Sequence, residues 1–142
     1  MQKICNPSPA AADSQPPIRT LLVDDSTVIM ICLSEYLDMQ ALVRLVGTAT
    51  NGSEAVRKAE ALQPDLVLMD LQMPCMDGLQ ATTLLRQRLP NTRIIIMTLD
   101  ETEATKAIAH AHGAHGFVGK SRLAEQLLPE IRRVFQQQPV AQ

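Results

Sequence analysis

Five short apolar runs alternate along this chain with five longer amphipathic segments, and this alternation restricts the fold more than any other feature. The runs are Ile18–Val23, Val43–Ala49, Leu66–Met69, Arg93–Leu99 and Gly116–Gly119. The spacing of apolar residues predicts helices from Thr27 to about Gln40, from a Ser53 cap to about Leu62, and over Leu79–Leu89, Thr102–His112 and Leu123–Phe135. Strands separated by such helices pair in parallel through right-handed crossovers. The sequence therefore predicts an α/β domain with a doubly wound, five-stranded parallel sheet.

A single folded domain is predicted over residues 18–135, between two tails. Residues 1–17 contain four of the nine prolines and little that packs into a core, so they are predicted to be disordered. Residues 136–142 are mostly polar and are predicted to fray. Neither an internal repeat nor an interdomain linker is evident in the sequence.

Composition argues against several classes of function. A net charge of −2 provides no basic surface for a nucleic acid, and one Tyr, two Phe and no Trp provide no platform for stacking bases. The longest apolar run, Val28–Leu33, is far too short to span a bilayer, and the layout of a signal peptide is missing. Three widely spaced cysteines do not indicate a disulfide framework. We therefore expect a cytoplasmic protein that binds neither nucleic acid nor membrane.

Polar and charged residues stand at the end of four of the five predicted strands. Asp24 and Asp25 follow the first strand, Asp70 the third, Thr98 the fourth and Lys120 the fifth. The carboxyl ends of parallel strands share one edge of the sheet, where ligands bind in folds of this class. We expect these five side chains to converge there, although any one of them alone is ordinary for a strand end.

Three carboxylates close together repel one another, and a hard divalent cation relieves this repulsion. Mg²⁺ takes oxygen ligands and keeps several waters, so two carboxylates and a backbone carbonyl suffice to hold it. A carboxylate can also accept a phosphoryl group as an acyl phosphate, with metal and lysine offsetting the charge. The set therefore suggests phosphoryl chemistry.

Four segments carry a resemblance to a known family: Leu21–Ser26, Leu68–Gly78, Ile96–Thr98 and Gly116–Lys120. They resemble the receiver (CheY-like) domain of bacterial two-component response regulators, and the pattern D-L-x-M-P-x-M-D-G that begins at Asp70 is highly specific. A more modest similarity points to regulators of the LuxR/NarL type. The resemblance implies a flavodoxin-like fold with strand order 2-1-3-4-5.

The resemblance also implies a role for each site residue. Asp25 and Asp70 would bind Mg²⁺ directly, together with the backbone carbonyl of Gln72, and Asp24 would act through a water. Asp70 would be the phosphoacceptor, and the phosphoryl group would meet the Thr98 hydroxyl and the Lys120 ammonium. Phe117 would be the aromatic switch residue. The domain would then be a switch with self-catalysed phosphorylation and dephosphorylation, not an enzyme acting on a separate substrate.

The implied partners follow the same resemblance. The phosphoryl donor would be a histidine kinase or a histidine phosphotransfer protein. Helix Thr102–His112, strand Gly116–Gly119 and helix Leu123–Phe135 would form the surface that changes, and this surface would bind a partner or a second copy as a homodimer. Helical spacing from Ile29 also predicts that Met30 and Ile31 are exposed beside the acidic residues and help to dock the donor.

The chain departs from the common receiver pattern at three positions. Ser121 follows Lys120 where many receivers have proline, so the cis peptide often found there lacks its usual cause. Leu99 follows Thr98 where a small residue is common, and its bulk is predicted to narrow access to the site. Phe117 replaces a more frequent tyrosine, so its switching would depend on packing.

Four alternatives remain open from the sequence. A Mg²⁺-dependent phosphohydrolase would need a titratable group close after Asp70, where Gln72 stands. A flavin mononucleotide binder would need a phosphate loop in place of Asp24 and Asp25. The chain could also be an interaction module that has lost phosphorylation, or the receiver fragment of a DNA-binding transcription regulator.

Overall fold

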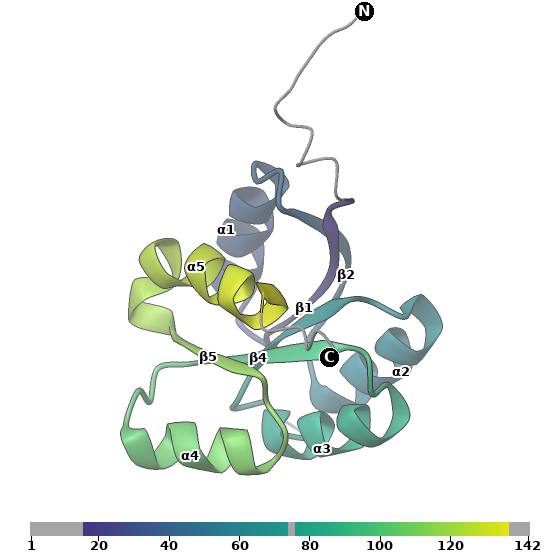
Figure 1. Cartoon of the computed structure of the whole chain (residues 1–142), viewed down its shortest axis with the longest axis vertical. Coiled ribbons are helices and arrows are strands. Elements are labelled where there is room, and N and C mark those ends of the chain that lie inside the picture. Colours follow the sequence, from purple (N-terminus) through teal and green to yellow (C-terminus); the bar gives the residue numbers. More distant parts are fainter. Residues whose placement is uncertain (1–15, 74–75, 137–142) are drawn as a thin grey trace, which may run out of the picture.

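The computed structural model describes residues 16–73 and 76–136 (Figure 1). Its elements, in chain order, are β1 (Ile18–Val23), α1 (Thr27–Asp38), β2 (Val43–Ala49), α2 (Gly52–Leu62), β3 (Leu66–Asp70), α3 (Gly78–Arg88), β4 (Arg93–Thr98), α4 (Glu103–Ala111), β5 (Gly116–Gly119), the 3₁₀ turn η2 (Lys120–Arg122) and α5 (Leu123–Gln136). The predicted tails, 1–17 and 136–142, lie almost wholly outside the described residues, so their disorder and fraying stay predictions.

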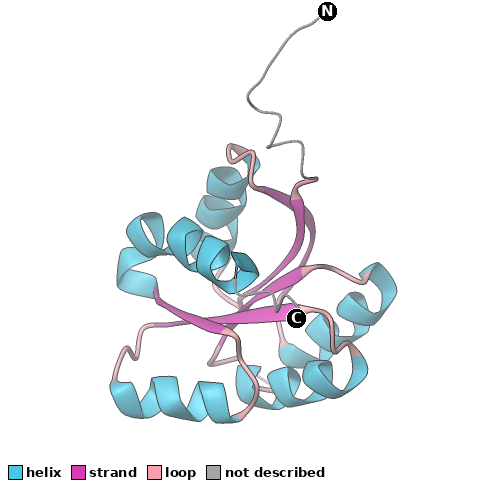
Figure 2. Cartoon of the chain, viewed as in Figure 1, coloured by secondary structure: helices cyan, strands magenta, loops and turns pink. Residues whose placement is uncertain are grey.

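All five strands join one parallel sheet in the order β2-β1-β3-β4-β5 (Figure 2). Helices α1 and α5 pack on one face of this sheet, and α2, α3 and α4 pack on the other (Figure 1). The predicted doubly wound fold and its strand order are confirmed. In the sheet, β2 lies on one flank of β1 and β3 lies on the other. The chain therefore reverses its direction of winding after β2, and a crevice forms at the carboxyl ends of β1 and β3.

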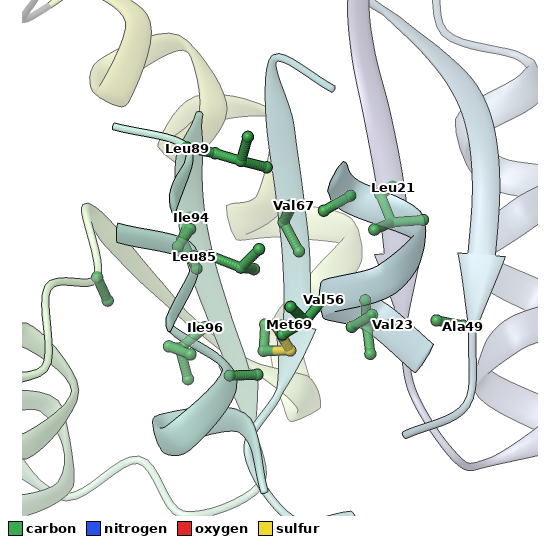
Figure 3. Packing of buried hydrophobic residues seen from close by; sticks show 14 of the residues in the cluster. Leu21, Val23, Ala49, Val56, Val67, Met69, Leu85, Leu89, Ile94 and Ile96 are labelled. Atoms are coloured by element: carbon green, nitrogen blue, oxygen red, sulfur yellow. The ribbon is translucent and has the colours of Figure 1, made fainter. Parts of the chain in front are cut away.

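Two apolar clusters, one on each face, hold the sheet between its helices. Every residue of β3 is buried, and alternate residues serve opposite faces. Val67 and Met69 face α2 and α3, where they meet Val56 and Leu85 (Figure 3). On the other face, a second cluster is built by β1, β2, β3, β4, β5, α1 and α5, and it contains Leu22, Leu33, Leu37, Val43, Leu66, Leu68, Ile95, Met97, Val118, Leu127, Ile131 and Val134. Burial on both faces explains why β3 and β4 are almost entirely apolar.

The start of α2 differs from the prediction that Ser53 caps it. Asn51 is the N-cap, because its Oδ1 accepts a hydrogen bond from Glu54 N–H at 2.8 Å. Glu54 reaches back to accept from Thr50 N–H at 2.8 Å, so two otherwise unpaired donors are satisfied together. Ser53 lies within the helix. Both residues are good caps, and the sequence does not say which of two adjacent candidates the backbone uses.

The other helices differ from prediction by one or two residues at their ends. Helix α1 ends at Asp38, two residues before the predicted Gln40. Helix α5 passes through Pro129 and continues to Gln136. Its buried residues Leu127 and Ile131 lie on either side of the proline, and their packing against the sheet offsets the backbone hydrogen bond that proline cannot make. In the described residues, no helix has the length and apolar character that crossing a membrane requires.

The end of α4 depends on Gly113, which has a left-handed φ of +108°. A Cβ at this position would also lie 2.6 Å from Arg86 Cγ. We expect Gly113→Ala to lower the free energy of unfolding by about 2 kcal/mol, since residues with a Cβ are strained at this φ. Urea denaturation followed by far-ultraviolet circular dichroism measures this loss.

The double variant Arg86→Ala/Gly113→Ala separates the two causes. It removes the contact with the flexible arginine but leaves the backbone strain. Most of the loss is therefore expected to persist, and full recovery in the double variant would contradict the role given to φ.

Candidate functional site

Side chains from distant parts of the chain meet at the carboxyl edge of the sheet. Asp24 and Asp25 follow β1, Asp70 ends β3, and Lys120 follows β5. The three aspartates place carboxylate oxygens within 4.8 Å of one another. The parallel sheet therefore gathers an acidic cluster from two strands and adds one lysine from a third, as the spacing of the sequence predicts.

The Lys120 ammonium joins two of these carboxylates. Its Nζ lies 2.7 Å from Asp24 Oδ2 and 2.9 Å from Asp70 Oδ1. The side chains are 10% exposed for Lys120, 0% for Asp24 and 6% for Asp70. Because all three charges are withdrawn from water, the two carboxylates depend on the ammonium as their counterion.

The environment shifts the protonation equilibria of the two partners. Burial raises the pKa of the Asp70 carboxyl, and the neighbouring Asp24 charge adds to this, while Lys120 and the Gln72 N–H lower it by a smaller amount. Burial alone would lower the pKa of Lys120, but hydrogen bonds to Asp24 and Asp70 outweigh that effect and raise it. Lys120 is therefore a fixed positive charge, and Asp70 is a carboxylate whose charge needs further compensation.

Asp24 provides an observation that bears on a metal. Its Oδ1 accepts a hydrogen bond from Ser26 N–H at 2.8 Å, while its Oδ2 faces Lys120. Within the described residues, Oδ2 has no hydrogen bond of regular geometry although it is buried. Asp25 beside it is exposed. The Asp24 carboxylate, next to the exposed Asp25 carboxylate and close to Asp70, fits a site that a hard cation and its waters complete.

Thr98 ends β4 next to the acidic cluster. β4 pairs with β3 so that Met97 lies opposite Asp70, which puts Thr98 one residue further along. Thr98 is buried, and its hydroxyl accepts a hydrogen bond from Asp100 N–H at 3.0 Å. The Asp100 carboxylate in turn accepts from Thr102 and Thr105, so the loop into α4 is held by its own side chains. Leu99 is 77% exposed and projects into solvent.

Two further residues with predicted roles, Gln72 and Phe117, lie in the loop after β3 and in β5. Gln72 is the second residue after β3, its backbone N–H is hydrogen-bonded to Asp70, and its side chain is exposed. Phe117 lies in β5, half-buried against the cluster under α2, α3 and α4, with the Lys106 ammonium 5.6 Å from its ring centre. Pro74 and Cys75 in the loop after Asp70 lie outside the described residues.

The turn after Lys120 contains a contact that the sequence did not indicate. The Ser121 hydroxyl donates a hydrogen bond to Glu101 Oε2, which ties the β5–α5 turn to the β4–α4 loop. No peptide bond in residues 16–73 and 76–136 is cis, so Lys120–Ser121 is trans, in line with the absence of proline there. Glu101 and Ser121 are both loop residues, and no periodic pattern relates them.

The exposed apolar surface of α1 corrects one prediction. Ile31 is exposed, as the helical spacing predicts, but Met30 is half-buried against the second cluster. Val28 is exposed instead, at 68%. The expected pair near the acidic edge is therefore Val28 and Ile31. Met30 packs against the second apolar cluster, to which α5 also contributes. The spacing of residues within α1 does not indicate this tertiary contact.

The comparison with family models decides the classification. The model described as "Response regulator receiver domain" matches residues 20–132, which is most of the chain. The chain belongs to this family. The predicted resemblance is thereby confirmed, and the α/β fold and the acidic edge are those of a receiver domain.

Relatives and solved structures agree with this classification. Response regulator protein VraR of Staphylococcus saprophyticus is 34% identical over 126 residues, covering 87% of this chain and 59% of the relative. The receiver thus spans little more than half of that relative's length. A LuxR-family two-component response regulator from Aurantimonas superposes with a TM-score of 0.80 at 30% identity, covering 85% of this chain and 86% of the other. The CheX–CheY–BeF₃–Mg²⁺ complex from Borrelia burgdorferi gives 0.80 at 27% identity, with 87% and 93% covered.

Removing the lysine should destabilise the fold. We expect Lys120→Met to lower the free energy of unfolding by about 3 kcal/mol, because it leaves Asp24 and Asp70 buried without a counterion. Lys106→Met is the matched control, since the Lys106 side chain is 51% exposed and pairs with Glu103 at 3.6 Å. Urea denaturation of both variants at pH 7 tests this, and equal losses would contradict it.

The raised pKa of Asp70 has a defined consequence for stability. A carboxyl whose pKa is higher in the folded state stabilises the fold when protonated, and this contribution is lost as pH rises through the folded pKa. Asp70→Asn is therefore expected to be more stable than the native chain at pH 7. The difference should narrow as pH falls toward the ordinary Asp value of 3.8. Urea midpoints measured across this range test both signs, with the exposed Asp38→Asn as control.

Proposed function

We propose that Asp70 accepts a phosphoryl group from a phosphohistidine and that the domain thereby acts as a switch in two-component signalling. The observation that supports this most directly is the Asp70 carboxylate itself, buried, 2.9 Å from the Lys120 ammonium and within reach of two further carboxylates. Membership in the receiver family gives the reaction its class.

Asp70 is the best candidate among the three acids. Asp24 is fully buried, and its two oxygens face Ser26 N–H and Lys120. Asp25 is exposed and lacks a cation at hydrogen-bonding distance among the described ion pairs. Asp70 combines a raised pKa with direct contact to Lys120. A raised pKa marks a basic carboxylate oxygen, and the adjacent ammonium can balance the additional negative charge that a phosphoryl group brings.

The transfer requires little covalent chemistry from the protein. A carboxylate oxygen of Asp70 would form the new bond to phosphorus while the phosphorus–nitrogen bond to the donor imidazole breaks and the imidazole keeps the electron pair. Lys120 would stay protonated and balance charge on the phosphoryl oxygens. The Thr98 hydroxyl would donate a hydrogen bond to one of them. These contributions are positioning and electrostatic stabilisation, which is what phosphoryl transfer demands.

We further propose that the site takes Mg²⁺. Asp25 and Asp70 would supply carboxylate oxygens, Gln72 a backbone carbonyl, and Asp24 would act through a water. All are hard oxygen donors, and the carboxylate oxygens of the three aspartates lie within 4.8 Å of one another, which supports a site of this kind. Bound there, the ion would neutralise charge on the transferred group. The CheX–CheY complex of Borrelia burgdorferi that this chain resembles was solved with BeF₃ and Mg²⁺, which supports Mg²⁺ as the cation here.

The signal would leave the site through Thr98 and Phe117. Thr98 now accepts from Asp100 N–H, and turning its hydroxyl toward a phosphoryl group on Asp70 would move the loop that begins α4. Phe117 lies half-buried in β5 and packs against the apolar cluster under α2, α3 and α4. The surface of α4, β5 and α5 would then change shape and bind a partner or a second copy.

The donor protein would approach over α1. Val28 and Ile31 expose apolar side chains on this helix, whose first turn adjoins Asp24 and Asp25. A phosphohydrolase is less well supported, because the Gln72 amide cannot act as the acid or base that such a reaction needs.

The proposal predicts a specific labelling result. With Mg²⁺ and isotopically labelled acetyl phosphate, the native chain should acquire a label that hydroxylamine removes, as expected for an acyl phosphate. Asp70→Asn should abolish this label because it removes the nucleophilic carboxylate. Filter binding and intact-protein mass spectrometry, which detects the added phosphoryl mass, both measure it.

Two controls define the result. Asp38→Asn, which changes an exposed aspartate at the end of α1, should label like the native chain. A chelator of Mg²⁺ should suppress labelling in every variant. Undiminished labelling of Asp70→Asn would assign the phosphoacceptor to another residue.

A further inference from the structure

The outer side of strand β5 is closed by side chains of helix α5. β5 is the last strand of the sheet, so backbone groups on its outer side have no neighbouring strand. Gly119 N–H donates to Gln126 Oε1 at 3.4 Å, and Phe117 N–H donates to Glu130 Oε2 at 2.9 Å. The Arg133 guanidinium donates to His115 O at 3.1 Å.

The spacing of these contacts explains how a helix can serve a strand. Residues 126, 130 and 133 lie on one side of α5. Residues 117 and 119 alternate along β5, and His115 directly precedes this strand. Helix α5 thus supplies polar atoms where a sixth strand would place its backbone. Satisfying edge groups in this way prevents another chain from pairing there.

Glu130 makes the shortest of the three contacts and is the best buried of the ionised partners. Its side chain is 19% exposed and pairs with Arg133 at 2.8 Å. Although burial acts to raise the pKa of the Glu130 carboxyl, the hydrogen bonds from Arg133 and Phe117 N–H outweigh it, and the pKa is lowered. The carboxylate is therefore ionised at neutral pH, and a charged acceptor gives a strong hydrogen bond.

The close approach of α5 depends on Gly116. A Cβ at Gly116 would lie 2.8 Å from Glu130 Oε2 and 2.9 Å from Val134 Cγ2. Only a glycine leaves room for the carboxylate against the strand. The contact is therefore built from both sides, by the glycine in β5 and by the acid in α5.

Glu130 accepts its hydrogen bond from the backbone N–H of Phe117, the predicted switch residue. Its ring is also fixed from outside, because Lys106 of α4 lies over it at 5.6 Å. We propose that Glu130 is a positioning residue that holds β5 at Phe117 in the conformation described here and so opposes the switch. This inference rests on the proposed function of Asp70 and Phe117. By linkage, releasing the strand favours the state that the phosphoryl group stabilises.

The test compares Glu130→Ala and Glu130→Gln with Glu125→Ala, which removes an exposed acid from the same helix. The first readout is hydrogen exchange of the Phe117 amide by nuclear magnetic resonance. Glu130→Ala should speed this exchange at least about tenfold, since a hydrogen bond to a charged group is lost. Glu130→Gln keeps an acceptor oxygen but loses the charge, so its exchange rate should lie between those of Glu130→Ala and the native chain. Glu125→Ala should stay close to the native chain.

The second readout is a titration with beryllofluoride at saturating Mg²⁺, as a mimic of the phosphoryl group. Glu130→Ala should bind it about fivefold more tightly than the native chain, while Glu125→Ala should match the native chain. A purely structural role for Glu130 would lower thermal stability and leave this affinity unchanged. That result would overturn the inference.

Two further outcomes keep the experiment decisive. If the native chain neither binds beryllofluoride nor labels at Asp70, the proposed function itself is refuted, and the inference about Glu130 falls with it. If Glu130→Ala does not fold, the native chain still provides a test. Its Phe117 amide must be protected from exchange although it lies at the edge of the sheet, and rapid exchange there would refute the contact.

Discussion

The double ion pair of Lys120 with Asp24 and Asp70 is the interaction on which the rest of this structure depends. It joins residues that follow the first and fifth strands to the last residue of the third, and it lies at 2.7 and 2.9 Å in a setting almost without solvent. Buried charges of this kind seldom add net stability compared with apolar residues, but they are costly to leave unpaired. The acidic residues at this edge therefore contribute to the chemistry of the site more than to stability. The buried apolar residues of β3 and β4 provide the free energy of folding that offsets their burial.

The same strand connects this edge to the surface of the domain. β5 ends immediately before Lys120, and Phe117 lies in the middle of the strand with its backbone bound to α5. In the proposed switch, a displacement at Lys120 would reach Phe117 through the backbone, because only the short end of β5 separates the two residues. The proposed site and the surface of α4, β5 and α5 thus share one short strand, which would give a physical route by which chemistry at Asp70 alters a distant contact.

Much of this arrangement could be predicted from the sequence because it depends on local periodicity and on one rule of topology. The strands Val43–Ala49 and Gly116–Gly119 have the predicted bounds, and Asp24, Asp70 and Lys120 meet because parallel strands end at one edge. The errors arise where tertiary contacts decide. Asn51 and Ser53 are equivalent caps in isolation, and Met30 is covered because of what α1 packs against. The Glu130 and Glu101 contacts join a helix to a strand edge and a loop to a turn, and no spacing in the sequence encodes either.

The distance along the chain between Asp24 and Lys120 has a consequence for biosynthesis. A ribosome makes the two aspartates long before the lysine, so the growing polypeptide reaches the stage of four strands with acids but no counterion for them. Until the fifth strand emerges, those carboxylates are best left hydrated, which disfavours premature closure of this end of the sheet. The sheet and its acidic site are therefore completed together, when the fifth strand and Lys120 join the other four strands. A nascent chain without this last strand has neither a complete sheet nor a neutralised site.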